Sequence, residues 1–242
     1  MLRKIRITLA VICFALITLL FLDFTGTIHA WFGWLAKIQF LPAVLAANFA
    51  VVAALVIVTL IFGRVYCSVI CPLGVMQDIF GHLGRTKRLG RRNRYTYSKA
   101  LTPLRVILLG VMVIAVIGGI GQIVALLAPY SAYGRIAQNL FAPVYDLVNN
   151  GLAYLAERAD SYAFYAVDIK IGSWIVFGVA ALTFVIVGWL SWRNGRTYCN
   201  TVCPVGTILG YLSRFSLLAP VIDTSKCINC GRCARNCKAA CI

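Results

Sequence analysis

The sequence predicts an all-α integral membrane protein with four transmembrane helices in two parallel repeats, followed by a small C-terminal ferredoxin-like iron–sulfur segment. Composition, four charge-free stretches and a repeated cysteine motif lead to this fold class. Of the 242 residues, 61% are hydrophobic and 12% are charged, against about 25% charged in a soluble domain. A single water-soluble core of this size could not bury so much apolar surface.

Four stretches contain no Asp, Glu, Lys or Arg, namely residues 7–22, 38–63, 106–134 and 171–192. A membrane-spanning helix needs about 20 mainly apolar residues, and the last three stretches reach that length. The first has 16 residues and spans a bilayer if Arg6 and Asp23 extend to the two interfaces. It is longer than most signal-peptide cores, so we expect an uncleaved anchor.

The basic residues are distributed as expected for a membrane protein and not for a nucleic-acid-binding protein. With four spans, the segments 1–6, 64–105 and 193–242 share one side and hold 19 of the 23 basic residues. By the positive-inside rule, both termini are cytoplasmic and the protein lies in the cell inner membrane. One basic cluster can also contact anionic lipid; it comprises Arg85, Lys87, Arg88, Arg91, Arg92, Arg94 and Lys99.

The most informative feature is an internal repeat. Residues 63–74 recur 132 positions later as residues 195–206, with seven of twelve positions identical in the pattern G-R-x-Y-C-x-x-x-C-P-x-G. Each copy follows an apolar stretch, which divides a transmembrane domain of residues 1–220 into halves of about 1–85 and 100–215. Parallel repeats related by an axis along the membrane normal would bring the two motifs face to face.

Each motif holds two cysteines on one face of a helical turn, because they are four residues apart. Together they offer four thiols, the usual ligand set of an iron–sulfur cluster, and the arginine of each motif would help to hold the negative charge. We therefore expect a cluster, shared or separate, at Cys67, Cys71, Cys199 and Cys203. Unligated structural thiols, thiol–disulfide pairs and a zinc site are the alternatives.

The C-terminal segment 221–242 holds a second kind of cysteine motif. Its spacing C-x₂-C-x₂-C-x₃-C is that of bacterial ferredoxins and predicts a 4Fe–4S cluster at Cys227, Cys230, Cys233 and Cys237. Zinc sites usually group their cysteines in two separated pairs. Because Lys238 replaces the usual proline and the sequence stops at Cys241-Ile242, we expect the natural chain to continue into a second motif. Otherwise Cys237 or Cys241 completes one cluster.

Together the paired motifs, four spans and ferredoxin run resemble the NapH-type membrane quinol dehydrogenase components of periplasmic nitrate reductase systems. The membrane core of NosR-type proteins is similar too. The resemblance implies an electron-transfer subunit that connects the quinone pool with iron–sulfur centres and other redox subunits. It places the clusters on the cysteines named above, and no flavin-binding domain accompanies them.

The remaining features are less specific. The outer segment 129–170 holds six tyrosines, which suit an interfacial anchor or the wall of a quinone site. His29 and His82 fall on opposite sides of the membrane and cannot ligate one haem together, and C-x-x-C-H is absent, so we expect no haem. No catalytic residue is identified.

We therefore expect a component of an oxidoreductase that exchanges electrons between quinone or quinol and a redox partner, and not a stand-alone enzyme. An assembly factor for a metalloenzyme and a structural scaffold subunit of a redox complex are the alternatives. Neither the terminal enzyme nor the direction of electron flow follows from the residues.

Overall fold

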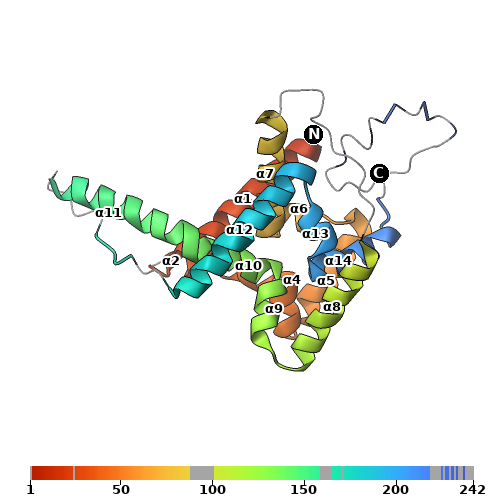
Figure 1. Ribbon diagram of the computed structural model, residues 1–242, viewed down its shortest axis with the longest axis horizontal. Helices are drawn as coiled ribbons and strands as arrows, with labels where there is room; N and C mark the ends of the chain where they lie inside the picture. Colours follow the sequence, from red (N-terminus) through yellow and green to blue (C-terminus); the bar gives the residue numbers. More distant parts are fainter. Residues whose placement is uncertain are drawn as a thin grey trace.

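The computed structural model describes residues 2–23, 25–87, 101–158, 165–169 and 172–218, together with 225, 227, 228, 230, 231, 233 and 237. These residues form helices and connecting turns, with no strand among them (Figure 1). In chain order the helices are α1 (Leu2–Leu22), α2 (Thr27–Phe32), α3 (Trp34–Lys37), α4 (Phe40–Leu45), α5 (Phe49–Phe62), α6 (Tyr66–Val69), α7 (Pro72–Lys87), α8 (Thr102–Ile117), α9 (Gly121–Leu127), α10 (Pro129–Ile136), the π-helical turn η1 (Ala137–Phe141), α11 (Ala142–Arg158), α12 (Trp174–Asn194), α13 (Thr197–Thr201), α14 (Pro204–Leu212) and the 3₁₀ turn η2 (Ser213–Phe215).

Two of the four charge-free stretches form single long helices. Within the described residues, Lys4–Leu22 of α1 and Trp174–Asn194, which is α12, are the helices long and apolar enough to cross a membrane. The expectation of one continuous helix is wrong for residues 38–63 and 106–134, which are divided into α4 and α5, and into α8, α9 and α10. Helices α5 and α8 are apolar but have only 14 and 16 residues.

Local backbone chemistry explains the break between α4 and α5 and the break between α8 and α9. Asn48 caps α5 because its side chain accepts a hydrogen bond from the N–H of Val51, a typical helix start. Helix α8 ends at Gly118, and Gly119 has a φ of +69°, a conformation in which glycine is favoured. Mean hydropathy does not detect helix caps or glycine turns, so the helices predicted from the charge-free stretches are longer than those in the structure.

The internal repeat is also a structural repeat. In the first half α5, α6 and α7 follow one another, and in the second half α12, α13 and α14 do so, with one motif spanning the two junctions of each set. Helix α7 packs along α12 of the other half, and α14 packs against α5 and α8. Because each post-motif helix contacts the opposite half, the two motifs are joined into one interface.

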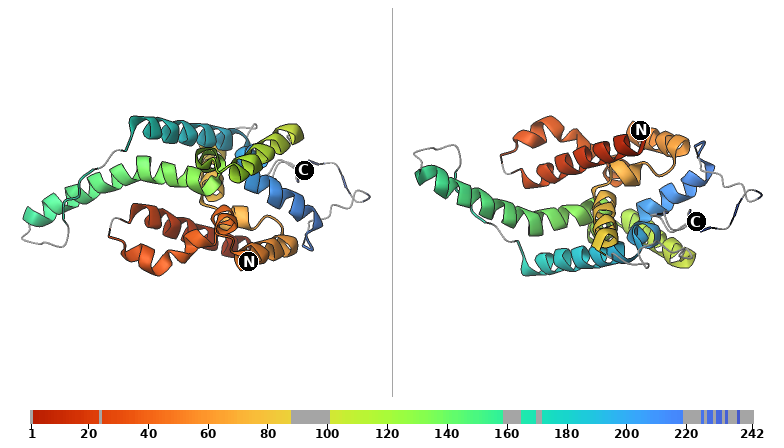
Figure 2. Two further views of the ribbon diagram at one scale, coloured as in Figure 1. Left: turned by 90° about the horizontal axis from the view of Figure 1, so that it is seen from below. Right: turned by 90° about the horizontal axis from the view of Figure 1, so that it is seen from above.

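Helices α1 and α12 lie on opposite sides of the molecule, with α10, η1 and α11 running between them (Figure 2). The core between these layers is apolar and includes Leu73, Val187 and Leu209, all with no exposed area. Helix α11 projects away from this body (Figure 1). The core therefore holds the two motif regions in a packed setting.

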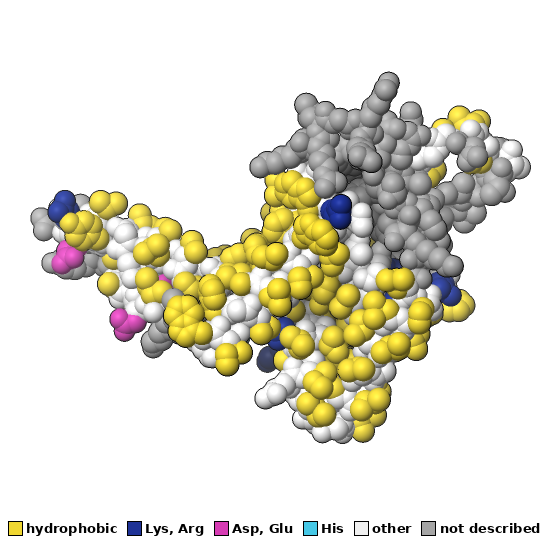
Figure 3. Space-filling view, viewed as in Figure 1, with side chains coloured by type: hydrophobic (Ala, Val, Ile, Leu, Met, Phe, Trp, Pro, Cys, Tyr) yellow, Lys and Arg dark blue, Asp and Glu magenta, His cyan; other side chains and the backbone are white. Residues whose placement is uncertain are grey.

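Apolar side chains cover much of the visible surface, including α11 and α12 (Figure 3). Ile117, Trp174 and Ile175 are among the most exposed, with 82%, 77% and 78% of their surface accessible. Large exposed apolar surfaces mark contacts with a membrane or with another protein.

Candidate metal centre

The glycine, arginine and tyrosine that begin each motif have structural roles in both copies. Gly63 and Gly195 end α5 and α12 with φ values of +70° and +72°, which favour glycine because a Cβ is disfavoured there. Tyr66 and Tyr198 are both buried. The hydroxyl of Tyr66 donates to Gln39 Oε1 at 2.9 Å and accepts from the N–H of Phe40 at 3.0 Å, which anchors the first motif to α4.

The last glycine of each motif allows close backbone packing. A Cβ at Gly74 would collide with the carbonyl oxygen of Cys67, and one at Gly206 would collide with that of Cys199. The prolines at 72 and 204 occupy the first position of α7 and α14, where a missing N–H costs nothing. The first turn of each long helix therefore lies directly against the first cysteine of its motif.

The second cysteine of each motif lies at the N-terminus of a helix. Cys203 caps α14, and its sulfur accepts a hydrogen bond from the N–H of Gly206 at 3.3 Å. Cys71 immediately precedes α7 in the same way, and the backbone N–H groups of Leu73 and Gly74 partly oppose the rise in its pKa. Backbone donors and the helix dipole both favour a thiolate at such a position.

All four motif cysteines are buried and are free of disulfides. Burial, together with the charge of Cys199, raises the pKa of Cys67 to about 12 and raises that of Cys71 as well. A hydrogen bond from the Cys203 thiol lowers the pKa of Cys199, and the same bond raises that of Cys203. The structure thus brings the cysteines of both halves within electrostatic range of one another.

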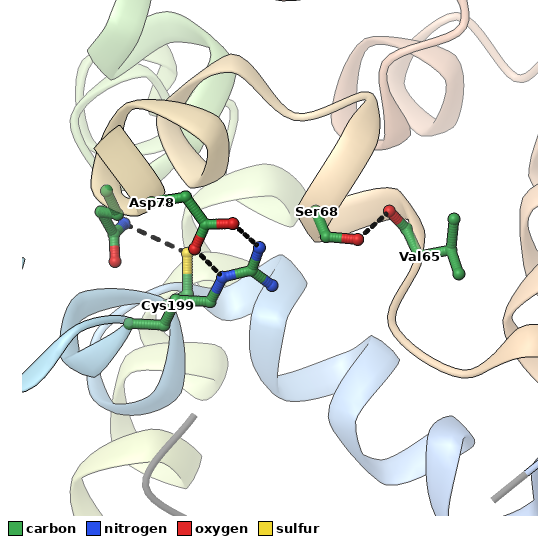
Figure 4. Close-up of polar contacts among 6 residues, drawn as sticks. Val65, Ser68, Asp78 and Cys199 are labelled. Atoms are coloured by element: carbon green, nitrogen blue, oxygen red, sulfur yellow. Dashed lines mark hydrogen bonds and ion pairs between the residues drawn. The ribbon is translucent and has the colours of Figure 1, made fainter. Parts of the chain in front are cut away.

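The arginine of each motif reaches across to the opposite half. Arg64 Nη1 donates to Asn200 Oδ1 at 2.7 Å. Arg196 forms a bidentate pair with Asp78 of α7, with Nε–Oδ1 and Nη2–Oδ2 distances of 2.8 Å and 2.7 Å (Figure 4). The charge of Arg196 opposes the rise in the pKa of Cys67 and contributes to the lowered pKa of Cys199, as expected for a cation that stabilises thiolates.

The two halves differ at the positions five and six residues after the motif proline. In the first half these are Gln77 and Asp78, and in the second half they are Leu209 and Gly210. Gln77 Nε2 donates to the sulfur of Cys199 at 3.2 Å. At the site equivalent to Asp78, the guanidinium of Arg64 lies over Gly210, with Nη2 3.1 Å from where a Cβ would be.

Gln77 and Asp78 were not predicted from the sequence, although aligning the two copies beyond the motif would have singled them out as differences. Four buried thiols, two neighbouring arginines and two helix N-termini are the kinds of group that an iron–sulfur cluster requires, and a cluster at these cysteines stays a prediction. Among the described residues, no three or more His, Cys, Asp or Glu side chains are arranged to hold a metal ion.

The cysteines of the predicted ferredoxin run are more exposed to solvent than those of the repeated motifs. Cys227, Cys230 and Cys233 are exposed and Cys237 is half-buried. Gly231, within the run, has a φ of +64°, which is consistent with the tight backbone path expected there. Cys241 and Lys238 lie outside the described residues, as do Arg88, Arg91, Arg92, Arg94 and Lys99 of the basic cluster.

The described tyrosines of the outer segment differ in exposure, and Tyr130 is partly buried. Tyr145, Tyr154 and Tyr165 are exposed, as an interfacial anchor or a site wall would require. Tyr133 is fully buried, and its hydroxyl lies 2.6 Å from Thr18 Oγ1 of α1, so it serves the core instead. Tyr162 lies outside the described residues.

Comparison with known proteins agrees with an iron–sulfur function. The family described as "4Fe-4S binding domain" matches residues 44–91 and again residues 174–220, so each match contains one copy of the repeated motif. The matched segments end before the C-terminal cysteine run. No solved structure matches the chain.

Similar curated proteins include the "putative electron transport protein YccM" of Escherichia coli K12, 26% identical over 200 residues, which cover 81% of this chain and 47% of that protein. Another is the "methylamine utilization ferredoxin-type protein MauN" of Paracoccus denitrificans, 27% identical over 186 residues, covering 74% and 49%. The chain thus spans about half the length of these relatives. The narrower resemblance to NapH-type and NosR-type proteins stays a prediction, whereas the similarities support an iron–sulfur electron-transfer family.

Proposed function

We propose that this chain is a membrane-bound iron–sulfur electron-transfer subunit that passes electrons between the quinone pool and a redox partner. One observation carries the proposal. The two repeat halves bring four buried cysteines into one region, where the arginine of each motif crosses to the other half. A structural thiol would need neither the second copy nor the positive charge.

The residues themselves supply what such a centre requires. Cys67, Cys71, Cys199 and Cys203 would ligate one cluster, and Cys227, Cys230, Cys233 and Cys237 would ligate a 4Fe–4S cluster. A bound cluster supplies one-electron transfer. Arg196 and the N-termini of α7 and α14 offset the negative charge of the thiolates, and burial keeps water away from the sulfurs.

A membrane location is supported by two different properties. Helices α1 and α12 have the length and apolar character of spans, and large apolar side chains are exposed on the surface of the fold. If all four charge-free stretches span the membrane, 19 of the 23 basic residues lie on one side, which supports a topology with both termini in the cytoplasm. That compartment keeps thiols reduced, as cluster ligation requires.

The test is iron and acid-labile sulfide per chain, with EPR spectra after dithionite reduction, on protein purified anaerobically. The variant Cys67→Ser/Cys199→Ser should lose one cluster signal, and Cys227→Ser/Cys230→Ser should lose a different one. Cys13→Ser is the matched control, because Cys13 lies alone in α1, and it should keep all the iron. Unchanged iron in the first variant would contradict a cluster at the repeat.

The link to quinone is tested separately by adding a short-chain quinol to the oxidised protein in lipid nanodiscs and recording the cluster signals. Reduction of the clusters supports electron exchange with the quinone pool. If the clusters are intact but quinol does not reduce them and quinone does not oxidise them, electron exchange with the quinone pool is contradicted. Full turnover of a partner with the cysteine-to-serine variants would instead indicate a scaffold.

A further inference from the structure

A cavity of about 290 Å³ lies between α1 and α7 and includes Ser68 of the first cysteine motif in its lining. Its walls are mainly apolar, with Ala10 of α1 and Ile79 of α7 among them, but four polar side chains also line it: Arg6, Ser68, Asp78 and His82. Ligand sites typically combine such an apolar lining with a few convergent polar groups.

Two polar residues of the cavity wall are linked to the cysteine motifs, one by the backbone and one by an ion pair. Ser68 is the residue after Cys67, on the same short helix α6 (Figure 4). Asp78 binds Arg196, whose charge acts on both Cys67 and Cys199. The cavity lining thus includes the chain neighbour of Cys67 and the ion-pair partner of the arginine whose charge acts on Cys67 and Cys199.

The apolar wall belongs to a helix with the character of a membrane span. Ile7 and Val11 of α1 line the cavity while 45% and 57% of their surface remains accessible, so the cavity lies at the surface of α1. In the proposed topology this part of α1 is at the inner interface, where Arg6 reaches the aqueous side. A ligand dissolved in the bilayer could enter here without crossing water.

The other half of the repeat is built differently at the equivalent place. Ser68, Asp78 and His82 correspond to Asn200, Gly210 and Arg214. There the guanidinium of Arg64 lies over Gly210, and Arg105 Nε donates to the carbonyl oxygen of Asn200. An arginine of the opposite motif thus lies at this position in both halves, over Gly210 in the second half and paired with Asp78 in the first, where Asp78 also lines the cavity.

We propose that the cavity between α1 and α7 binds the headgroup of a quinone or quinol. This rests on the proposed function and identifies its membrane-soluble reactant site. A quinone ring has apolar faces and two oxygen atoms at its edges, which match the lining. Oxidation of a quinol to a quinone releases two electrons, which the proposed clusters would take one at a time, and two protons from its hydroxyl groups, which would pass to water at the end of the cavity lined by Arg6 and His82.

The test uses a photoreactive azidoquinone with a short alkyl tail and the cluster-loaded protein in nanodiscs, with labelled peptides identified by mass spectrometry. Labels competed by excess unmodified quinone should fall within residues 6–11 or 75–83. Ile79→Trp should fill the cavity and reduce specific labelling by at least about tenfold. The fold should accept the larger side chain, because 42% of the surface of Ile79 is accessible.

Tyr211→Trp is the matched control, since Tyr211 occupies the equivalent position in the second half, and it should label as the wild type does. Iron content and EPR spectra of both variants show whether the fold is retained. Specific labels in the tyrosine-bearing segment 129–158, or labelling that Ile79→Trp leaves unchanged, would overturn the cavity while the proposed function stands. If excess unmodified quinone does not reduce the labelling, the reagent has labelled lipid-exposed surface, and the cavity proposal is also overturned. The proposed function fails separately if quinol does not reduce the oxidised clusters of the wild-type protein.

Discussion

Arg196 and Asp78 are 118 residues apart in the sequence and form a bidentate ion pair across the two halves of the repeat, with side chains only 13% and 18% exposed. Removing one partner of a buried pair leaves an uncompensated charge, which costs about 3–5 kcal/mol. The pair therefore fixes the relative position of the two motifs as well as the charge beside the cysteines.

The variant Asp78→Ala is accordingly expected to lower the free energy of unfolding by about 3–5 kcal/mol, measured by denaturant or thermal unfolding in detergent. Asp146→Ala on α11 is the control, with an expected change within about 0.5 kcal/mol. The double variant Asp78→Ala/Arg196→Ala should lose less than the sum of the two single variants. Strict additivity would show that the pair is not coupled.

Gly74→Ala and Gly206→Ala should each lose iron at the repeat and unfold at a lower temperature, because the new Cβ meets the carbonyl oxygen of Cys67 or Cys199. The rigid helix starts beside each glycine leave little room for adjustment. Gly178→Ala in α12 is the control, because nothing lies within 4 Å of a Cβ there. It should be neutral or stabilising by up to about 1 kcal/mol, and equal effects at all three positions would disprove the packing explanation.

Gln77→Leu converts the first half to the residue found at Leu209 in the second half, and it removes the hydrogen bond to Cys199. Hydrogen bonds to ligand sulfurs help to set the reduction potential of a cluster by stabilising its more negative, reduced state. The potential of the repeat centre should fall while iron content is retained, as measured by EPR-monitored redox titration. Leu209→Met is the control and should leave the reduction potential unchanged. An unchanged potential in Gln77→Leu would show that Gln77 does not influence the proposed cluster.

Metal removal should expose a pH dependence of stability. Burial, followed by the charge of Cys199, raises the folded-state pKa of Cys67 from 9.0 to about 12. The folded protein therefore holds a proton that the unfolded chain releases above pH 9, so stability falls as pH rises from 9 toward 12. Unfolding of the metal-free protein across this range should show the loss, and Cys67→Ala should show a smaller pH dependence.

The sequence alone was sufficient for the features that depend on local chemistry. The helical character and the long apolar helices α1 and α12 follow from residue types at fixed spacings. The repeated motif indicated an iron–sulfur protein, which the family match over residues 44–91 and 174–220 supports, and its ligand set stays a prediction. The two broken stretches did not follow, because the Asn48 cap and the Gly118–Gly119 turn interrupt helices without changing mean hydropathy. The tail motif was visible as a spacing, and its cluster stays a prediction.

Only the tertiary structure decided how the two halves meet. The identity of seven motif positions indicated symmetry, whereas the contacts around the two motifs are asymmetric. Asp78 pairs with Arg196 and Gln77 donates to Cys199, both in the second motif. At the position equivalent to Asp78, the guanidinium of Arg64 packs on Gly210. A motif records which side chains a turn requires, because those constraints are local. Which partner each arginine finds depends on residues more than 100 positions away, and that pairing exists only once α7 packs along α12.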